Sequence, residues 1–281
     1  MNEKKRKVFP RFLAVFICLL WFVPFMSAGE EQNKQKNDYR IGKLFFTNLA
    51  VHTWDVFTSP VQWKGKDFLI FSSVLGAGAL SFWADEDIRD WVIERKTSRA
   101  DDCFNVLTYL GDGRLLFGLI ATLYASGEIA DDRSLRKTAI MSLESFLASS
   151  AIVWTLKAAA GRARPYTGES EQAFHPFTFS NRYFSFPSGH SSGVFAVATT
   201  IALQSESVVI DILSYSLAFA AASARIYKDA HWFSDVLIGS AIGYFTARKI
   251  HSLHQKEKPE MLDLGFFFLP DKKGITVSFS F

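Results

Sequence analysis

Long apolar stretches, separated by short charged or glycine-containing connections, fill most of the chain between residues 44 and 258. Their length and their spacing of apolar positions are typical of helices. An amphipathic stretch, Leu44–Phe57, comes first. The helices expected after it are Asp67–Ala84, Asp85–Lys96, Asp102–Leu110, Arg114–Ser126, Leu135–Ala160, Gly189–Gln204, Val208–Ala224 and His231–His254. The pattern predicts an all-α domain over residues 44–258, a helical bundle of about six core helices.

The C-terminal segment, residues 259–281, has a different pattern. Four apolar residues alternate with Thr and Ser at the very end, Ile275, Val277, Phe279 and Phe281. Such alternation is typical of a strand, and Leu262–Leu269 precedes it across a Pro-Asp-Lys-Lys-Gly connection. We therefore expect a short C-terminal β-hairpin. The terminal Phe also resembles the last strand of an outer-membrane barrel, but one hairpin cannot close a barrel.

The N-terminal segment, residues 1–28, has the pattern of an export signal. A basic start is followed by the apolar run Phe12–Phe25 and by small residues at Ser27 and Ala28. This order predicts a secretory signal peptide, with an uncleaved signal anchor as the alternative. Residues 29–43 are largely polar and are expected to form a linker. An exported protein of the periplasm or cell envelope follows from this interpretation.

Charge and cysteine content narrow the function classes. The whole chain carries 31 basic and 28 acidic side chains. Residues 29–281 hold 26 basic and 27 acidic side chains, so the positive net charge lies in the N-terminal segment. Nucleic-acid binding is therefore not expected. Of the two cysteines only Cys103 follows the signal, so no internal disulfide can form in a processed chain.

The apolar stretches are compatible with a globular domain that contacts a membrane and with a bundle that spans it. Most of their charge-free runs are shorter than the roughly 20 residues that a membrane-spanning helix needs. If the signal is cleaved and six helices span, the connections around residues 157–165 and 223–231 would face the cytoplasm. We therefore favour an exported globular domain that contacts a membrane through aromatic surfaces. An integral membrane bundle remains the alternative.

The richest candidate chemistry lies between Ser223 and Asp235, where Arg225, His231 and Asp235 fall close together. His231 and Asp235 are four residues apart, so they share a face if the chain is helical from Ala230. A carboxylate there can accept a hydrogen bond from one ring nitrogen and leave the other to attack or bind. A helix start with a buried histidine and an aspartate cap is the plainer alternative.

Two further stretches contain groups that bind anions. Lys157 and Arg164 bracket six residues before a proline. Ser188 and Gly189 open a long apolar run, and a helix start of this kind presents free backbone N–H groups to an anion. His190 in the same turn can donate a proton to a leaving oxygen. Taken singly, these stretches are also compatible with a solvated helix end and an ordinary N-cap.

The order of these motifs resembles the type 2 phosphatidic acid phosphatase superfamily, which includes bacterial class A acid phosphatases and vanadium haloperoxidases. The pattern is Lys-x6-Arg-Pro, Pro-Ser-Gly-His and Arg-x5-His-x3-Asp, except that Ala224 stands where the family usually has Ser. The resemblance implies a phosphohistidine on His231, positioned by Asp235, with His190 as acid and base. The implied phosphate-binding residues are Lys157, Arg164, Ser188, Gly189 and Arg225.

The remaining histidines and the connection between the first two motifs lie outside the motif pattern. The stretch Thr167–Ser185 is rich in Phe and is expected to form either a wall or lid over the site or a packed loop. His175 within it is expected to be solvated. His251 and His254 are three apart and could bind a metal, but a solvated helix end is the favoured interpretation. His52 is expected to be structural or exposed.

Together the motifs predict a metal-independent phosphatase without a cofactor, acting on a phosphate monoester or pyrophosphate. Export and Phe-rich surfaces favour a phosphorylated lipid over a small phosphate ester. The alternatives are a general soluble periplasmic acid phosphatase, a vanadate-dependent haloperoxidase and a non-catalytic envelope protein. No metal ligands are assigned to the expected site, and the oligomeric state stays open.

Overall fold

The computed structural model describes residues 39–256 and the two strands 262–269 and 272–279. The predicted export signal, residues 1–28, lies outside the described residues. Nine α-helices are described: α2 (Lys43–Thr58), α3 (Gly65–Phe82), α4 (Asp85–Glu94), α5 (Ser98–Leu107), α6 (Gly113–Ile129), α7 (Arg133–Ala160), α8 (Gly189–Gln204), α9 (Val208–Tyr227) and α10 (Phe233–Lys256). Short 3-10 turns follow α2 and α5 at Ser59–Gln62 and Thr108–Gly111.

Local capping explains where several of these helices begin and end. Asp112 and Asp132 accept hydrogen bonds from backbone N–H groups at the starts of α6 and α7. Gly161 ends α7 in the left-handed conformation, which a residue without a Cβ adopts readily. The predicted helical bundle is thus confirmed. One boundary is corrected: α10 begins at Phe233, so His231 lies in the turn before the helix and not within it.

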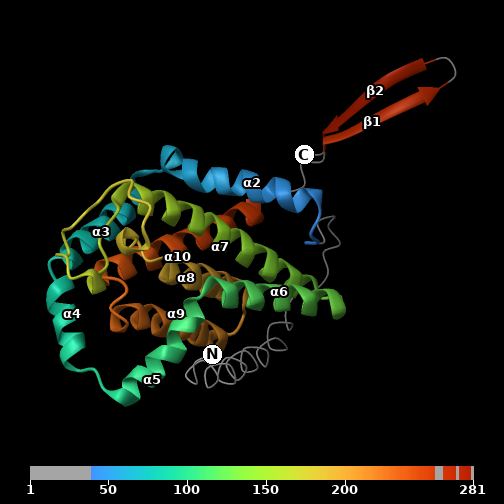
Figure 1. The fold of residues 1–281 in the computed structure, drawn as a ribbon. Helices are drawn as coiled ribbons and strands as arrows, with labels where there is room; N and C mark the ends of the chain where they lie inside the picture. Colours follow the sequence, from blue (N-terminus) through green and yellow to red (C-terminus); the bar gives the residue numbers. More distant parts are fainter. Residues whose placement is uncertain (1–38, 257–261, 270–271, 280–281) are drawn as a thin grey trace.

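The bundle is built around α8, which packs against α7, α9 and α10 (Figure 1). All residues from Ser191 to Thr200 are buried. Helices α8 and α10 approach closely, since a Cβ on Gly243 would lie 2.1 Å from the carbonyl oxygen of Ser192. Glycine at this position therefore lets the two backbones touch, which fixes the position of α10 relative to the start of α8.

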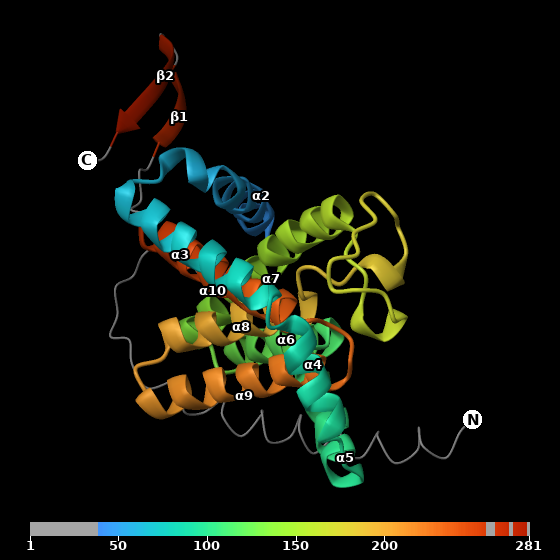
Figure 2. The same ribbon diagram turned by 90° about the vertical axis from the view of Figure 1, so that its left-hand side faces the viewer.

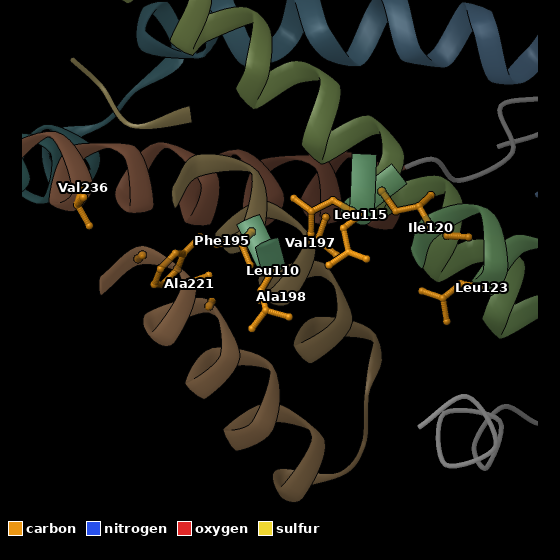
Figure 3. Close-up of a cluster of buried hydrophobic side chains, with 14 of the residues drawn as sticks. Leu110, Leu115, Ile120, Leu123, Phe195, Val197, Ala198, Ala221 and Val236 are labelled. Atoms are coloured by element: carbon orange, nitrogen blue, oxygen red, sulfur yellow. The ribbon is translucent and has the colours of Figure 1, made fainter. Parts of the chain in front are cut away.

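Apolar side chains from α6, α8 and α9 form the main core (Figure 3). The cluster includes Leu116, Ile120 and Leu123 of α6 and Phe195 and Val197 of α8. Full burial of a side chain of this size contributes about 1.5–3 kcal/mol to stability. The core therefore holds α6, α8 and α9 in fixed relative positions and supports the turns at their ends.

The outer helices expose many large apolar side chains. Helices α3, α4 and α5 follow one another along the outside of the bundle (Figure 2). Within α3 only Gly78 and Ser81 are buried, while Phe68, Leu69 and Leu80 face outward. Large exposed apolar patches of this kind mark contact with another apolar phase or partner.

Length and composition allow some of these helices to cross a membrane. Among the described residues, α7 and α9 are long and apolar enough on their own. The number rises to four if α3 with α4, and the Ser98–Gly111 segment with α6, each form one bent span. The bends within these pairs are 56° and 57°. The helices thus fit membrane association.

Beyond the bundle, β1 (Leu262–Leu269) pairs antiparallel with β2 (Lys272–Phe279). Leu262 lies opposite Phe279 and Leu269 opposite Lys272. This ribbon lies apart from the helices (Figure 1).

Candidate active site

The three sequence motifs meet at one end of the bundle. Helices α7 and α9 end there, near Lys157 and Arg225, whereas α8 and α10 begin there. The antiparallel course of consecutive helices thus gathers residues from four helix ends, with the connection between α7 and α8 completing the site.

Two cations come from the end of α7 and the connection that follows it. Lys157 is buried, and its Nζ donates to the carbonyl oxygens of Phe184 and Ser185. Arg164 donates from Nε to Asn181 O at 2.8 Å and from Nη1 to Ala230 O at 3.0 Å. These bonds hold the guanidinium in place, with Nη1 3.4 Å from His231 Nε2.

The start of α8 contributes backbone donors and a histidine. Ser188 is the N-cap, fully buried, and its Oγ accepts a hydrogen bond from Ser191 Oγ at 2.9 Å. A Cβ on Gly189 would lie 3.8 Å from Lys157 Cε, so the helix start faces that lysine. His190 follows in the first turn. An anion beside these residues would therefore meet the N–H groups and positive dipole end of α8.

Arg225, at the end of α9, supplies the third cation. Its Nη1 donates to Thr108 Oγ1 at 2.7 Å, and its buried Nε has no hydrogen-bond partner among the described residues. An unpaired buried N–H group is costly, and an oxyanion at this position would satisfy it. Ala224, which replaces the usual serine, is fully buried beside it.

His231 and Asp235 lie together but do not form the direct hydrogen bond that the sequence predicted. His231 Nδ1 is 3.8 Å from Asp235 Oδ2, too long for a hydrogen bond. The carboxylate already has other donors: Trp232 N at 3.0 Å and Ser185 Oγ on Oδ2, and Arg162 on Oδ1. His231 Nδ1 thus faces Asp235, and its Nε2 faces Arg164.

The sequence did not reveal how Asp235 is anchored. Arg162 Nη1 donates to Asp235 Oδ1 at 2.7 Å, and its Nη2 donates to Asp85 Oδ2 at 2.8 Å. Asp85 also accepts from Ser234 N at 2.8 Å and from Ser234 Oγ. Asp85 starts α4, far from the motifs in the chain, and its only sequence signal was its place at a helix start.

The electrostatics of the site favour neutral histidines in the absence of an anion. Burial first, and then the charges of Lys157, Arg164 and Arg225, hold the pKa of His231 well below its usual range. Burial and the charge of Arg225 lower the pKa of His190 to about 3. Several cations crowded beside two neutral imidazoles, one buried and one partly buried, suit a site for a dianion, whose charge would also raise both histidine pKa values.

The connection between α7 and α8 closes one side of the site. Residues Arg162 and Phe174 form an isolated bridge within it. His175, expected to be solvated, is partly exposed and forms a 2.7 Å hydrogen bond with Glu169 Oε2. Phe177 and Phe179 point outward, with exposed fractions of 71% and 79%. These two aromatic residues therefore lie on the outer surface of the loop.

Known proteins resemble the segment that carries this site. A model of the PAP2 superfamily matches residues 139–259. The lipid A 1-phosphatase of Porphyromonas gingivalis is 41% identical over 61 residues, which cover 21% of this chain and 14% of that relative. The matched segment is thus a small part of the relative's length.

Two solved structures share the fold. The crystal structure of LpxE from Aquifex aeolicus has a TM-score of 0.50 at 21% identity, covering 60% of this chain and 94% of that one. A transmembrane PAP2 type phosphatidylglycerolphosphate phosphatase from Bacillus subtilis has a TM-score of 0.52 at 20% identity. That match covers 77% of this chain and 96% of the Bacillus subtilis chain. Residues 139–259, which carry the three motifs, are thus similar to the PAP2 superfamily.

Proposed function

We propose that the protein is a metal-independent phosphatase that hydrolyses a phosphate monoester or pyrophosphate of a lipid. The observation that carries the proposal is the buried cluster at the bundle end. Arg164 Nη1 lies 3.4 Å from His231 Nε2, while Lys157 and Arg225 act on the same imidazole through their charges. Cations fixed around a nucleophile are what phosphoryl transfer requires of a protein.

The first half-reaction forms a phosphohistidine. Lys157, Arg164, Arg225 and the N–H groups at Ser188 and Gly189 hold the phosphate oxygens. His231 Nε2 then attacks phosphorus in line, because its Nδ1 faces Asp235. As the new P–N bond forms, the P–O bond to the leaving group breaks.

His190 serves as acid and then as base. The bound dianion raises its pKa, so the imidazole carries the proton that the leaving oxygen takes. In the second half-reaction His190 accepts a proton from water, which attacks phosphorus. The P–N bond then breaks, and phosphate leaves with His231 neutral again.

A lipid substrate is favoured by the surface around the site. Trp154 is 60% exposed on the last turns of α7, and Phe179 lies nearby against Phe184, with a ring-centroid distance of 6.3 Å. Phe184 also meets Trp154 at 5.6 Å. Aromatic side chains in such positions are typical of a membrane interface. A phosphate held at this level would belong to a headgroup whose acyl chains lie in the bilayer.

The cellular placement is part of the same proposal. Residues 1–28 serve as an export signal or anchor, residues 29–43 as a linker, and residues 44–258 form the phosphatase domain at a periplasmic membrane face. We further propose that residues 259–281 form an appended hairpin. Helices α7 and α9, with the exposed faces of α2 and α3, place the domain in or on the membrane.

The test is phosphate release from a panel of phosphorylated lipids and water-soluble esters, with the full chain purified in detergent. We expect turnover of a lipid phosphate in mixed micelles and its loss, by about 10⁴-fold or more, in His231→Ala. Quenching during turnover in alkaline detergent should trap an alkali-stable, acid-labile phosphoenzyme in the wild type and none in His231→Ala.

Other results would point to the alternatives. Turnover of soluble esters only indicates a general acid phosphatase, and halide oxidation with added vanadate indicates a haloperoxidase. Undiminished hydrolysis by His231→Ala, or no hydrolysis of any ester by wild type, contradicts the proposed function.

A further inference from the structure

Three side chains meet in the interior at the opposite end of the bundle from the phosphate site. They are His52 of α2, Glu144 of α7 and His254 of α10, and all three are buried. His254 is therefore not at a solvated helix end, contrary to the sequence-based expectation. Glu144 precedes Lys157 by 13 residues on α7, which corresponds to about 20 Å at a rise of 1.5 Å per residue.

The donor atoms of this group converge on one point. His52 Nδ1 lies 2.9 Å and His254 Nε2 2.8 Å from the same carboxylate oxygen, Glu144 Oε2. One potential ligand atom from each residue lies within 4.8 Å of the others. The second carboxylate oxygen, Glu144 Oε1, is buried and has no hydrogen-bond partner among the described residues.

A pure hydrogen-bond cluster accounts poorly for this arrangement. Two imidazoles bound to one carboxylate would satisfy it best by taking one oxygen each. If both imidazoles are neutral, the buried Glu144 also leaves an uncompensated negative charge, which is costly in an apolar interior. A divalent cation would supply the missing charge and a partner for the second oxygen.

From this geometry we propose that His52, Glu144 and His254 bind a divalent transition-metal ion of the Zn²⁺ type. Two imidazoles and one carboxylate are a common ligand set for Zn²⁺, with bonds of about 2.0–2.2 Å. Tetrahedral ligands at that radius lie about 3.3–3.5 Å apart, so the hydrogen-bonded atoms need to separate by only about 0.5 Å. The fourth position is open to water.

The role that follows is structural. The three ligands come from three helices, and α2 precedes the bundle in the chain and packs against α7 and α10. A metal there fixes α2 to the bundle at a distance from the phosphate site. The two ring nitrogens must lose or move their protons on binding, so affinity falls as the pH is lowered.

The test uses the full chain in detergent, stripped with a chelator and titrated with Zn²⁺ alone or Co²⁺ alone. We expect one equivalent of Zn²⁺ to bind and to raise the melting temperature, and Co²⁺ to give the visible absorption of a four- or five-coordinate site. Loss of a residue that only hydrogen-bonds to a metal ligand typically weakens metal binding by ~10–100-fold. Glu144→Gln and His254→Gln remove a ligand itself, so each should weaken Zn²⁺ binding by at least that factor.

The matched control is His251→Gln, one turn earlier on α10, where the ring contacts Gln204 at 2.9 Å and lies outside the cluster. It should bind Zn²⁺ as the wild type does. The wild-type Co²⁺ spectrum needs no variant, so poor folding of a variant does not decide the outcome. Absence of saturable Co²⁺ and Zn²⁺ binding by the wild type overturns the proposal. So does wild-type affinity in folded His254→Gln.

Discussion

Arg162 Nη1 donates a 2.7 Å hydrogen bond to Asp235 Oδ1, and both side chains are completely buried. The same guanidinium stacks over Phe82, with its central carbon 4.1 Å from the ring centroid. Asp85 and the ring of Phe82 thus hold the Arg162 guanidinium in the position from which it binds Asp235, the carboxylate beside His231. The orientation of the proposed nucleophile depends on an ion pair that begins at α4, outside the three sequence motifs.

This relationship predicts that Asp85 is a positioning residue. In Asp85→Asn, Arg162 loses an ionic partner and Asp235 shifts, and a displacement of about 1 Å costs about 10²-fold in rate. We expect kcat to fall with little change in KM, because the cations that bind phosphate are untouched. Steady-state kinetics on the lipid substrate measure this split.

The matched control for Asp85→Asn is Arg89→Gln. Arg89 lies on the same helix, α4, and the variant removes its 2.6 Å ion pair with Asp229. It should lower the melting temperature without a comparable loss of kcat. Equal kcat losses in the two variants would show that α4 acts only through general stability.

Gly161 predicts a second pair of variants. It has φ of +60°, and an added Cβ would lie 1.9 Å from His175 O. Gly161→Ala therefore combines about 1–2 kcal/mol of backbone strain with a clash that displaces the loop carrying Arg164. The melting temperature and kcat of Gly161→Ala should therefore both be lower than those of the wild type.

Gly168→Ala separates the two effects. Gly168 has φ of +78°, but an added Cβ would meet nothing within 4 Å. This variant should show the strain alone, with kcat close to wild type. If Gly161→Ala behaves like Gly168→Ala, the close loop packing has no role in the reaction.

The pH dependence of stability follows from His231. Its pKa in the folded protein lies well below 6.5, because of burial first and then the nearby cations. Below about pH 6.5 the unfolded chain takes up a proton at this residue that the folded chain does not. The free protein should therefore lose stability as the pH falls below 6.5, while above it the contribution is constant. Denaturant unfolding at several pH values, with and without phosphate, measures this.

Arg164→Gln should make the acid side of that profile shallower, since it removes one of the charges that depress the pKa of His231. In kinetics, the same variant should move the acid limb of kcat/KM toward higher pH. An acid limb that stays in place in Arg164→Gln would mean that another group controls it.

Chelators should separate the two proposed sites. EDTA is expected to leave the initial rate of phosphate release unchanged, because every group assigned to catalysis is a side chain or backbone N–H. It should lower the melting temperature by removing the ion from His52, Glu144 and His254. Immediate loss of turnover on EDTA addition, restored by Zn²⁺, would contradict the metal-independent mechanism.

The sequence alone determined the helices and the motif residues, since apolar periodicity, caps and Gly161 are local signals that survive without knowledge of packing. It also placed the charged motif residues in order, from Lys157 to Asp235. The hydrogen bond from His231 to Asp235 could not be judged this way, because it depends on Arg162, Ser185 and Trp232 competing for the same carboxylate.

Only the tertiary structure decided which residues meet across the bundle. Asp85 lies 150 residues before Asp235, and His52 lies 92 before Glu144, so no periodicity within one helix connects them. Their partners are set by how α2, α4, α7 and α10 cross, which depends on side-chain packing along whole helices and on close contacts such as Gly243 against Ser192. Burial then lowers the pKa values of His190 and His231 and shields the ion pair of Arg162 from water. The burial of a side chain is decided by the assembled fold.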